Sequence, residues 1–448
     1  MYPSDQLEPQ TGARKLRVPQ ATQRLVELFL RAKLRFMGLP AFAQVLLVFA
    51  ASRVWGWFVF STVARQQLTS PWGSGPLSYA QFLSIWDAGW YEKIAVSGYP
   101  QHLPHSASGV VEQNQWAFMP AYPMVSGGLA KIFDVSYMSA AIGVALISGF
   151  IAAWVIYLLF KESLAKTNWQ EPESVSAASA QSSRHTLALW AVAVFGFAPV
   201  SAVLQIPYAE SFNLIFLAAS LLFLLRSHYI LALPFALIAC LSRPIGVPLG
   251  ATFGLWWAWT VFTESGGTAL SYRKLATSFK KHLVQLVCAL AVCAFALLWP
   301  LIAWMRTGEP DAYTATETAW RGSHLYLFAP WIEQSKHYLG VFGPLLLAAL
   351  VVAFFGVLLS PLTSRTLAPA LRLWCASFAV YLLLFWFPQS STFRMMLPLF
   401  VLVLPLVALS TSRAYRALLI TSGAVLQAGW VGWLWHWKQL PGGGDYPP

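Results

Sequence analysis

The chain has 448 residues, of which 57% are hydrophobic and only 10% are charged. Soluble domains carry roughly 25% charged residues, so this composition excludes an ordinary soluble protein and indicates an all-α, polytopic membrane protein. The net charge of +12 does not indicate a nucleic-acid partner, because the basic residues stand in short loops beside apolar segments, where they set membrane topology.

The first 39 residues are predicted to form a basic cytoplasmic tail. Their basic residues precede the first long apolar run over a length that does not fit a cleaved signal peptide. Within this tail, the segment "QRLVELFLRAKLRF" has apolar residues at helical spacing with basic residues between them. Such a pattern predicts a helix that lies on the inner surface of the membrane.

The apolar windows that follow predict about eleven transmembrane helices within a membrane-embedded domain at 40–438. A short external tail at 439–448 is expected after them. The expected spans are 40–64, 137–160, 186–204, 210–226, 229–242, 246–263, 283–305, 338–360, 371–388, 395–410 and 417–437.

The segment "WAFMPAYPMVSGGLAKIF" at 116–133 decides the orientation of every later loop. Its prolines and glycines allow either a span or a helix lying on the membrane. If it does not cross, the inner loops carry about twice as many Lys and Arg residues as the outer loops, as the positive-inside rule requires. We therefore expect the N-terminus inside, the C-terminus outside, and a large first external loop at 65–136 with interfacial helices.

The stretch "SIWDAGWYEKIAVSGYP" at 84–100 places one acid, Asp87, among aromatic residues in that first external loop. The spacing of Trp86, Trp90 and Ile94 predicts an amphipathic helix with aromatic side chains at the headgroup level. An Asp at the start of such a helix can accept hydrogen bonds from backbone amides. The stretch by itself fits either a general base held toward a lipid-borne substrate or a helix cap.

Four further polar stretches are expected on the same outer side of the membrane. Several spans between them are short, which fits helices that begin at the rim of an external cavity. The stretches are "PYAES" at 207–211, "SRPIG" at 242–246, "RTGEPDAYTATETAWRG" at 306–322 and "QSSTFR" at 389–394.

These stretches, taken in order, resemble the PIG-V family of mannosyltransferases. "WDAGWYEKIAVSGY" is similar to the family pattern W-D-x-x-W-Y-x-x-I-A-x-x-G-Y, and "AFMPAYP" to F-x-P-x-Y-P. "FAPVSAVLQIPYAESFNLIF" resembles N-P-[AV]-S followed by Y-[ST]-E-S, "SRPIG" resembles S-R-x-x-G, "GEPDAY" resembles G-D-P-x-A-[FY], and "FRMMLPLF" resembles R-x-x-L-P-L-[FY]. The similarity covers about residues 84–400. Two positions depart from it: Ala198 stands where the family often has Asn, and Glu309 where it often has Asp.

The resemblance implies a GT-C-type helical bundle that transfers mannose from a polyprenyl- or dolichyl-phosphate-mannose donor with inversion. It carries the role of general base onto Asp87. It implies no cofactor beyond the lipid-linked co-substrate, and no metal-ligand cluster stands in the sequence. The expected acceptor is a glycolipid or protein at the outer face of a bacterial plasma membrane; a eukaryotic member would act in the endoplasmic reticulum on a GPI-anchor precursor.

An inverting transfer from a lipid phosphate needs a base for the acceptor hydroxyl and a cation for the departing phosphate. Arg243 and Arg394 are the candidate phosphate ligands, because both stand at outer helix ends in apolar surroundings where an unpaired guanidinium is costly. Each can instead pair with a carboxylate such as Glu210.

Several polar and aromatic side chains near these groups are candidate substrate ligands. Glu210 also suits an arginine partner, and the acids of the Gly-Pro turn also suit a loop cap. The candidates are Trp86, Trp90, Tyr91, Tyr208, Glu210, Ser211, Glu309 and Asp311.

Three other functions are compatible with a polytopic membrane chain. A lipid or sugar transporter needs polar access from both sides, whereas the polar stretches gather on one side. A GT-C transferase for another lipid-linked sugar, such as an arabinofuranosyl or glucosyl unit, is also compatible, although the motif match favours mannose. A structural scaffold leaves the ordered external stretches without a purpose.

Overall fold

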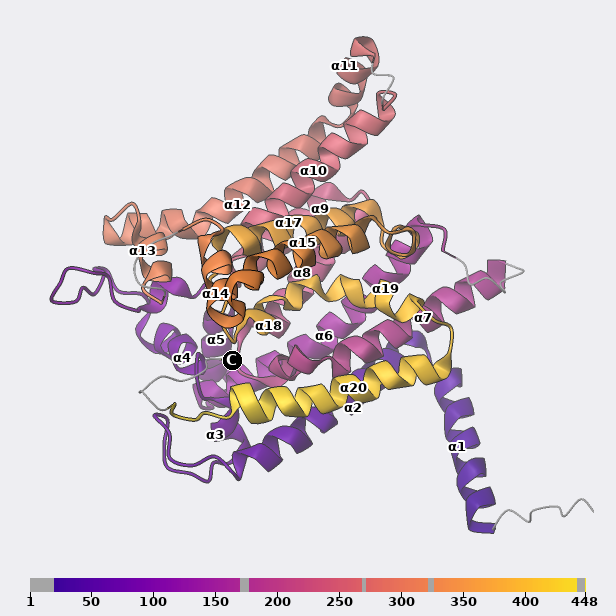
Figure 1. Ribbon diagram of the computed structural model, residues 1–448, viewed down its shortest axis with the longest axis horizontal. Coiled ribbons are helices and arrows are strands. Elements are labelled where there is room, and N and C mark those ends of the chain that lie inside the picture. Colours follow the sequence, from indigo (N-terminus) through magenta and orange to yellow (C-terminus); the bar gives the residue numbers. More distant parts are fainter. Residues whose placement is uncertain (1–19, 170–176, 268–270, 321–325, 441–447) are drawn as a thin grey trace, which may run out of the picture. The chain divides into compact units, whose positions relative to one another are not determined.

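The computed structural model describes residues 20–169, 177–267, 271–320, 326–440 and 448 (Figure 1). The chain divides into two compact units, Met1–Gln44 and Val45–Pro448. In the first unit, helix α1 (Gln20–Gly38) contains the predicted amphipathic segment. In the same unit, Gln44 Nε2 donates to the carbonyl of Leu39 at 2.9 Å, just after α1 ends. The second unit contains every candidate site residue.

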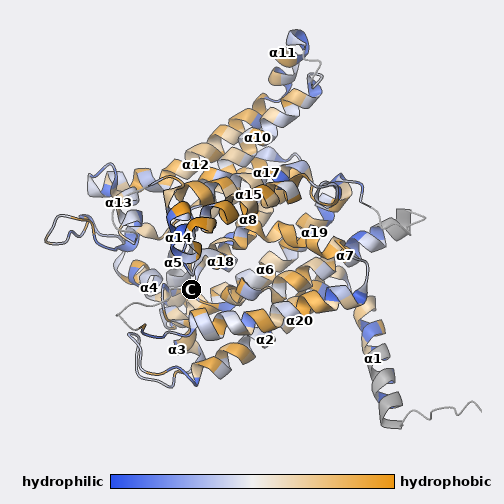
Figure 2. Ribbon diagram, in the orientation of Figure 1, coloured by the Kyte–Doolittle hydropathy of each residue, from blue (hydrophilic) through white to orange (hydrophobic). Residues whose placement is uncertain are grey.

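The described residues form helices and no named strand, which confirms the expected all-α membrane architecture. Five of these helical segments are long and apolar enough to cross a membrane. They are α2 (Ala41–Ala64), α6 (Tyr137–Lys166), α12 (Leu283–Thr307), the run of α14 (Ala329–Leu339), η3 (Gly340–Phe342) and α15 (Gly343–Leu359), and the run of α20 (Arg413–Trp430) and η5 (Val431–Trp435). Figure 2 shows hydrophobic residues along these helices and hydrophilic residues at their ends.

A sixth candidate span is broken. Helix α7 (Ala177–Phe197) is followed by the 3₁₀ segment η2 (Pro199–Gln205), and the two are bent by 81°. The number of described helices that meet the length and composition of a span is therefore five or six, not eleven. The difference arises largely because some expected spans contain only short helices: 17 residues in α8 (Ala209–Leu225), 12 in α9 (Tyr229–Cys240), and a 3₁₀ segment followed by six residues of α19 (Val403–Ala408) within 395–410.

The remaining apolar helices are 17 residues or shorter, apart from α10 (Gly246–Glu264). At 1.5 Å per residue, 17 residues extend about 25 Å, less than the roughly 30 Å of a hydrocarbon core. These short helices are α8 (Ala209–Leu225), α9 (Tyr229–Cys240), α17 (Pro369–Phe385), and the pair η4 (Leu397–Leu402) and α19 (Val403–Ala408).

Arg53, whose role the sequence leaves open, holds the break between α7 and η2. Its guanidinium donates to the carbonyls of Gly196 at 2.7 Å and Ser201 at 2.5 Å, and its side chain is buried. Carbonyls at a helix end lack intrahelical partners and favour a positive charge. Gln427 of α20 adds a hydrogen bond to Ser201 Oγ at 2.9 Å. The break is thus satisfied by side chains from two other helices.

Helix α8 is buried on nearly all sides and packs along α6. A helix that is apolar all round belongs in the interior of a bundle. The buried face of α6 includes small residues such as Ala145, Gly149 and Ala152, which allow neighbouring backbones to approach closely. The N-terminal end of α8 carries Tyr208 and Glu210 to the candidate site.

The segment 65–136, predicted to be the first external loop with interfacial helices, contains several short helices. These are α3 (Tyr79–Leu83), α4 (Ala88–Ser97), η1 (Gln115–Ala117) and α5 (Ala121–Phe133). Helix α4 buries Ala88, Tyr91 and Ile94, whereas Trp86 precedes the helix. The predicted surface stripe of Trp86, Trp90 and Ile94 is therefore wrong, because the buried side of α4 packs on α5.

Four other short helices complete the described structure. Helix α11 lies at the tip of the hairpin that α10 and α12 form side by side, and there Lys281 Nζ and Glu264 Oε2 are 2.9 Å apart (Figure 1). The short helices are α11 (Tyr272–Lys281), α13 (Ala312–Thr318), α16 (Pro361–Thr366) and α18 (Thr392–Met395).

Candidate functional site

Stretches that lie far apart in the sequence line one cavity of about 470 Å³. Three of the four polar stretches predicted on the outer side reach it, together with the first external loop. Its polar and aromatic lining includes Asp87 and Trp90 beside α4, Ser242 and Arg243 between α9 and α10, Glu317 and Trp320 at α13, and Gln389, Ser391 and Arg394 at α18. We call it the polar cavity.

Four charged side chains form an alternating chain behind and within the wall of the polar cavity. Arg394 Nη2 lies 2.8 Å from Asp87 Oδ2, and Arg394 Nε lies 3.6 Å from Glu210 Oε1. Arg243 Nη1 lies 3.0 Å from the same Glu210 oxygen. The side chain of Glu210 is 3% exposed and that of Asp87 is 29% exposed. Of the two carboxylates in this chain of charges, Asp87 is therefore the one that is open to the polar cavity.

The cation at the centre of this chain stays charged. Burial disfavours a charged guanidinium, but the carboxylates of Asp87 and Glu210 outweigh burial and raise the pKa of Arg394. The guanidinium carbon also lies 5.1 Å from the centre of the Tyr208 ring, a cation–π contact. Breaking one partner would leave the others as uncompensated buried charges.

Asp87 is not held as a helix cap. It occupies the N-cap position of α4, but its backbone is helical (φ −67°, ψ −14°) and its carboxylate makes no capping hydrogen bond. A capping side chain normally needs an extended backbone at that position. The expectation of backbone-amide donors is therefore wrong, and Arg394 takes their place.

Tyr208 fixes the backbone at Asp87. Its hydroxyl accepts a hydrogen bond from the Asp87 N–H at 2.8 Å and donates to the carbonyl of Ile85 at 3.3 Å. Burial raises the pKa of Tyr208 well above its ordinary value, so the phenol remains a neutral donor. Tyr208 is 1% exposed and does not line the cavity, so its predicted role as a substrate ligand is replaced by this supporting role.

Aromatic rings make one side of the polar cavity. Trp90 stacks on Phe118 with ring centres 5.9 Å apart, and Trp320 meets Trp90 edge to face at 5.8 Å. Aromatic rings offer broad apolar faces on which sugar rings can lie, beside polar groups that fix orientation. Trp86, Trp90 and Tyr91 all line the cavity, and their role in binding a substrate stays a prediction.

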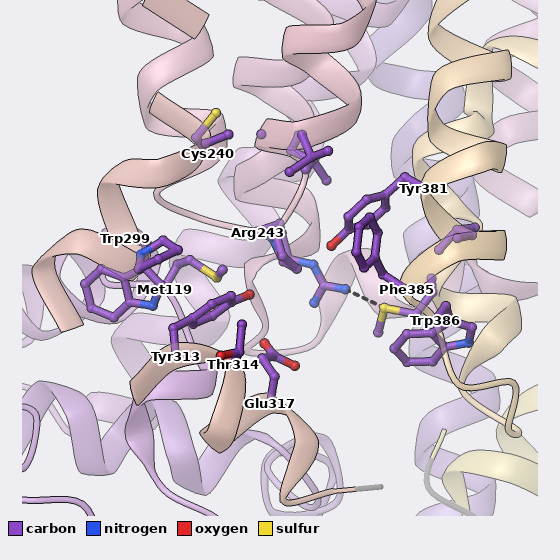
Figure 3. A pocket seen from close by; sticks show the side chains of 18 of the residues that line it. Met119, Cys240, Arg243, Trp299, Tyr313, Thr314, Glu317, Tyr381, Phe385 and Trp386 are labelled. Carbon is purple, nitrogen blue, oxygen red and sulfur yellow. Dashed lines mark hydrogen bonds between the residues drawn. The ribbon is translucent and has the colours of Figure 1, made fainter. Parts of the chain in front are cut away.

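A second cavity of about 270 Å³ adjoins the first (Figure 3). Its lining is mostly apolar and comes from α10, α12, α13 and α17, so we call it the apolar cavity. In Figure 3, Arg243 projects into its middle, with Glu317 on one side and Trp386 on the other. The residues that line both cavities are Met119, Arg243, Pro244, Glu317, Trp386 and Met395.

The two acids of the Gly-Pro turn lie outside both cavities. Glu309 Oε2 is 4.0 Å from His105 Nε2, and both side chains are more than a third exposed. Asp311 stands at the N-cap position of α13 without a capping hydrogen bond. Their predicted role in binding substrate is not supported, because the turn that carries them lies beyond the cavity wall.

Ser211 also lies away from both cavities. It is fully buried, and its hydroxyl has no hydrogen-bond partner among the described residues. Its predicted role as a substrate ligand is likewise not supported. The sequence placed it beside Glu210, but adjacent residues on a helix point in different directions.

The sequence reasoning missed Glu317, Tyr313, Trp386 and Gln389, which line one or both cavities. One signal was available for part of this set. Tyr313, Glu317 and Trp320 stand at i, i+4 and i+7, the spacing of one helical face. The predicted turn at 306–322 therefore contained a helix whose lining face begins after Asp311.

Asp87 and Glu210 are paired with arginine. No group of three or more His, Cys, Asp or Glu residues that could hold a metal ion is found in the described part of the chain. Cys240 lines the apolar cavity but lies away from the carboxylates. The chemical resources of the site are therefore the carboxylates of Asp87 and Glu317, an arginine between two cavities, and aromatic surfaces.

Comparison of the chain with protein-family models gives no match, and comparison with curated proteins gives no similar sequence. The geometry of the two cavities and the motif resemblance are therefore the grounds for assigning a function.

Proposed function

We propose that this chain is a membrane glycosyltransferase that moves a sugar from a polyprenyl-phosphate-sugar donor to an acceptor hydroxyl. One observation carries the proposal: an apolar cavity and a polar cavity share a wall, and an arginine projects from that wall. A lipid-linked sugar has the same three parts in the same order, an apolar chain, a phosphate and a polar sugar. The motif resemblance supports mannose as the sugar.

Arg243 is the proposed ligand of the donor phosphate. Its Nη1 bonds Glu210, and its Nη2 approaches only the weak acceptor Met395 Sδ, at 3.0 Å. A guanidinium carries five N–H donors. The contacts within the described residues use two of them, so three N–H groups of Arg243 remain for a phosphate. The isoprenoid chain would lie in the apolar cavity, and the sugar and acceptor in the polar cavity.

Arg394 is reassigned from phosphate ligand to partner of Asp87. Its side chain is 8% exposed and is already engaged by the carboxylates of Asp87 and Glu210. A phosphate would have to displace a buried ion pair to reach it, which costs more than binding at Arg243.

The proposed reaction is a single displacement at the anomeric carbon. An Asp87 carboxylate oxygen takes the proton of the acceptor hydroxyl, and the acceptor oxygen forms the new bond to the anomeric carbon. The bond from that carbon to the phosphate oxygen breaks, and its electron pair leaves with the lipid phosphate. Arg243 stabilises the charge that develops on the phosphate, and the sugar inverts its configuration.

The proposed acceptor is a glycolipid or protein of the cell envelope. The excess of Lys and Arg in the predicted inner loops supports a polar cavity that opens on the extracytoplasmic side of a plasma membrane, with the N-terminus in the cytoplasm. The same orientation in a eukaryotic cell would direct the cavity into the lumen of the endoplasmic reticulum.

The test measures transfer of radiolabelled mannose from polyprenyl-phosphate-mannose in membranes that contain the full chain. Asp87→Asn keeps the size of the side chain and removes the base, so we expect a loss of about a hundredfold or more. Asp134→Asn is the matched control, because Asp134 is an exposed acid outside both cavities with a left-handed backbone that Asn also tolerates.

Activity of Asp87→Asn equal to that of the wild type would reject the assignment of the base. If the wild-type protein transfers glucose or arabinofuranose but no mannose from the corresponding lipid phosphates, the sugar is reassigned and the mechanism stands. Absence of protein-dependent transfer from every lipid-linked sugar tested would reject the glycosyltransferase and favour a transporter.

A further inference from the structure

We propose that the C-terminal turn of the chain positions Asp87 by holding the preceding residue, Trp86, in a left-handed backbone conformation. The effect on Asp87 as a catalytic base rests on the proposed function, whereas the restraint on the Trp86 backbone does not. The positioning residues are Trp435 and Trp437, which we call the C-terminal clasp, and Gln67, which anchors it. None of the three lines either cavity.

The backbone of Trp86 requires an external restraint. Its φ is +64°, a region that bulky residues other than glycine rarely adopt. A residue in such a conformation persists only where its surroundings over-determine it, and such residues gather at functional sites. Trp86 immediately precedes the proposed base, so its φ sets the direction from which the chain enters Asp87.

Two reciprocal hydrogen bonds join the turn around Asp87 to Trp435. The indole of Trp86 donates through Nε1 to the carbonyl of Trp435 at 2.9 Å. The indole of Trp435 donates through Nε1 to the carbonyl of Phe82 at 2.8 Å. One C-terminal residue thereby holds the chain before Asp87 at two points. Trp435 is fully buried, and its ring lies 5.5 Å from that of Tyr208.

A local irregularity in the last helix aims Trp435 at this turn. Segment η5 is one π-helical turn, closed by a hydrogen bond from His436 N to the carbonyl of Val431 at 2.9 Å. A π turn contains one residue more than an α turn and therefore rotates the following side chains around the helix axis. A regular continuation of α20 would direct Trp435 elsewhere.

Gln67 anchors the clasp from outside the site. Its Nε2 donates to the carbonyl of Trp437 at 3.1 Å, and its Oε1 accepts from the N–H of Trp437 at 3.0 Å. The side chain is buried. Because Gln67 touches neither Asp87 nor the cavities, it offers a way to loosen the clasp without altering the surface that a substrate meets.

The experiment compares Gln67→Ala with Gln66→Ala in the purified full-length protein. Gln66 is the matched control because its side chain is exposed and only its backbone contacts His436. Hydrogen exchange of residues 84–91 should accelerate about tenfold in Gln67→Ala and remain unchanged in Gln66→Ala, because two hydrogen bonds to the clasp are lost. Transfer assays should then show a lower kcat for Gln67→Ala and a donor KM within twofold of the wild type.

Equal exchange of residues 84–91 in both variants would overturn the proposal. Acceleration spread evenly over the whole chain would also overturn it, since that result indicates general destabilisation. Faster local exchange with an unchanged kcat would refute the positioning role. If Gln67→Ala does not fold, exchange is read instead in Trp86→Phe, which removes the indole donor to Trp435 and keeps an aromatic ring. A wild-type protein without transfer activity would reject the proposed function, while the exchange result would still decide whether the clasp holds Trp86.

Discussion

Arg394 and Asp87 stand 307 positions apart in the sequence, and their side chains meet with Nη2 and Oδ2 2.8 Å apart. This ion pair joins α18 to the start of α4, within the segment predicted to be the first external loop. It orients the proposed base and also connects it, through Glu210, to the proposed phosphate ligand Arg243. The proposed catalysis and the stability of this site therefore involve the same four side chains.

Loss of Arg394 should destabilise the protein more than loss of the Asp87 charge. Arg394→Met leaves Glu210 buried with one fewer partner, which should cost about 3 kcal/mol of unfolding free energy. Asp87→Asn affects a side chain that is nearly a third exposed and should cost about 1 kcal/mol. Thermal unfolding in detergent shows which of the two variants, Arg394→Met or Asp87→Asn, is less stable. Arg306→Met, at an exposed residue, is the control, and equal melting temperatures for all three variants would contradict the buried network.

Arg243→Gln should weaken use of the donor rather than of the acceptor. Loss of a charge-assisted hydrogen bond to phosphate corresponds to about a ten- to hundredfold rise in donor KM. Inhibition of transfer by free polyprenyl phosphate should weaken by a similar factor. Arg226→Gln is the matched control, because Arg226 also pairs with a glutamate, Glu162 at 3.0 Å, but outside the site. A donor KM that changes equally in both variants would move the phosphate site elsewhere.

The buried phenol of Tyr91 should cause the free energy of unfolding to fall as the pH becomes alkaline. Burial, followed by the charge of Glu210, raises the pKa of Tyr91 above its ordinary value. Below about pH 10 both the folded and unfolded chains keep the phenolic proton. Above that pH the unfolded chain loses its proton first, so the free energy of unfolding falls as pH rises.

Melting temperatures measured from pH 8 to 11 test this effect. Tyr91→Phe should flatten the decline above pH 10, whereas Tyr272→Phe, at a ring that is 86% exposed, should leave the decline as in the wild type. A decline in Tyr91→Phe as steep as that of the wild type would assign the alkaline sensitivity to other groups.

Cysteine labelling tests the proposed orientation. Tyr272→Cys lies on α11 and Ser108→Cys lies in the first external loop, and both positions are exposed. A membrane-impermeant maleimide added to intact cells should label Ser108→Cys and leave Tyr272→Cys unlabelled until the cells are opened. The parent chain is the background control, because its Cys293 is exposed in the structure. The reverse labelling pattern would invert the topology and direct the polar cavity into the cytoplasm.

The sequence predicted the class of fold and much of the lining of the polar cavity. The hydropathy of an apolar window is an average over many residues, so it indicates a membrane helix even when the packing of the individual side chains is unknown. The polar stretches around Asp87, Arg243 and Arg394 are short exceptions to that apolarity, and three of the four predicted outer stretches join the first loop at one cavity. The number of spans could not be predicted from the sequence. An apolar segment such as the one that contains α9 resembles a span until the ends of its 12-residue helix are known.

The pairing of charges could not be predicted from local pattern. The bond between Arg243 and Glu210 depends on the packing of the α9–α10 turn against the start of α8. The left-handed backbone of Trp86 was also beyond reach, since it depends on a residue about 350 positions later. Glu309 and Asp311 were predicted to bind substrate because of their residue type. Residue type indicates what a side chain can bind, but it does not indicate which way the turn that carries it faces.

The wall shared by the two cavities makes their sizes interdependent. Met119, Trp386 and Met395 each border both compartments, so replacing any of them changes the room available on both sides at once. Under the proposed function, selection for a bulkier lipid would therefore also relax the fit of the polar group beside it. A change confined to one compartment must come from a residue that lines that compartment alone, such as Phe378 in the apolar cavity or Gln113 in the polar cavity. At such positions the proposed substrate preference can diverge without a change in the shared wall.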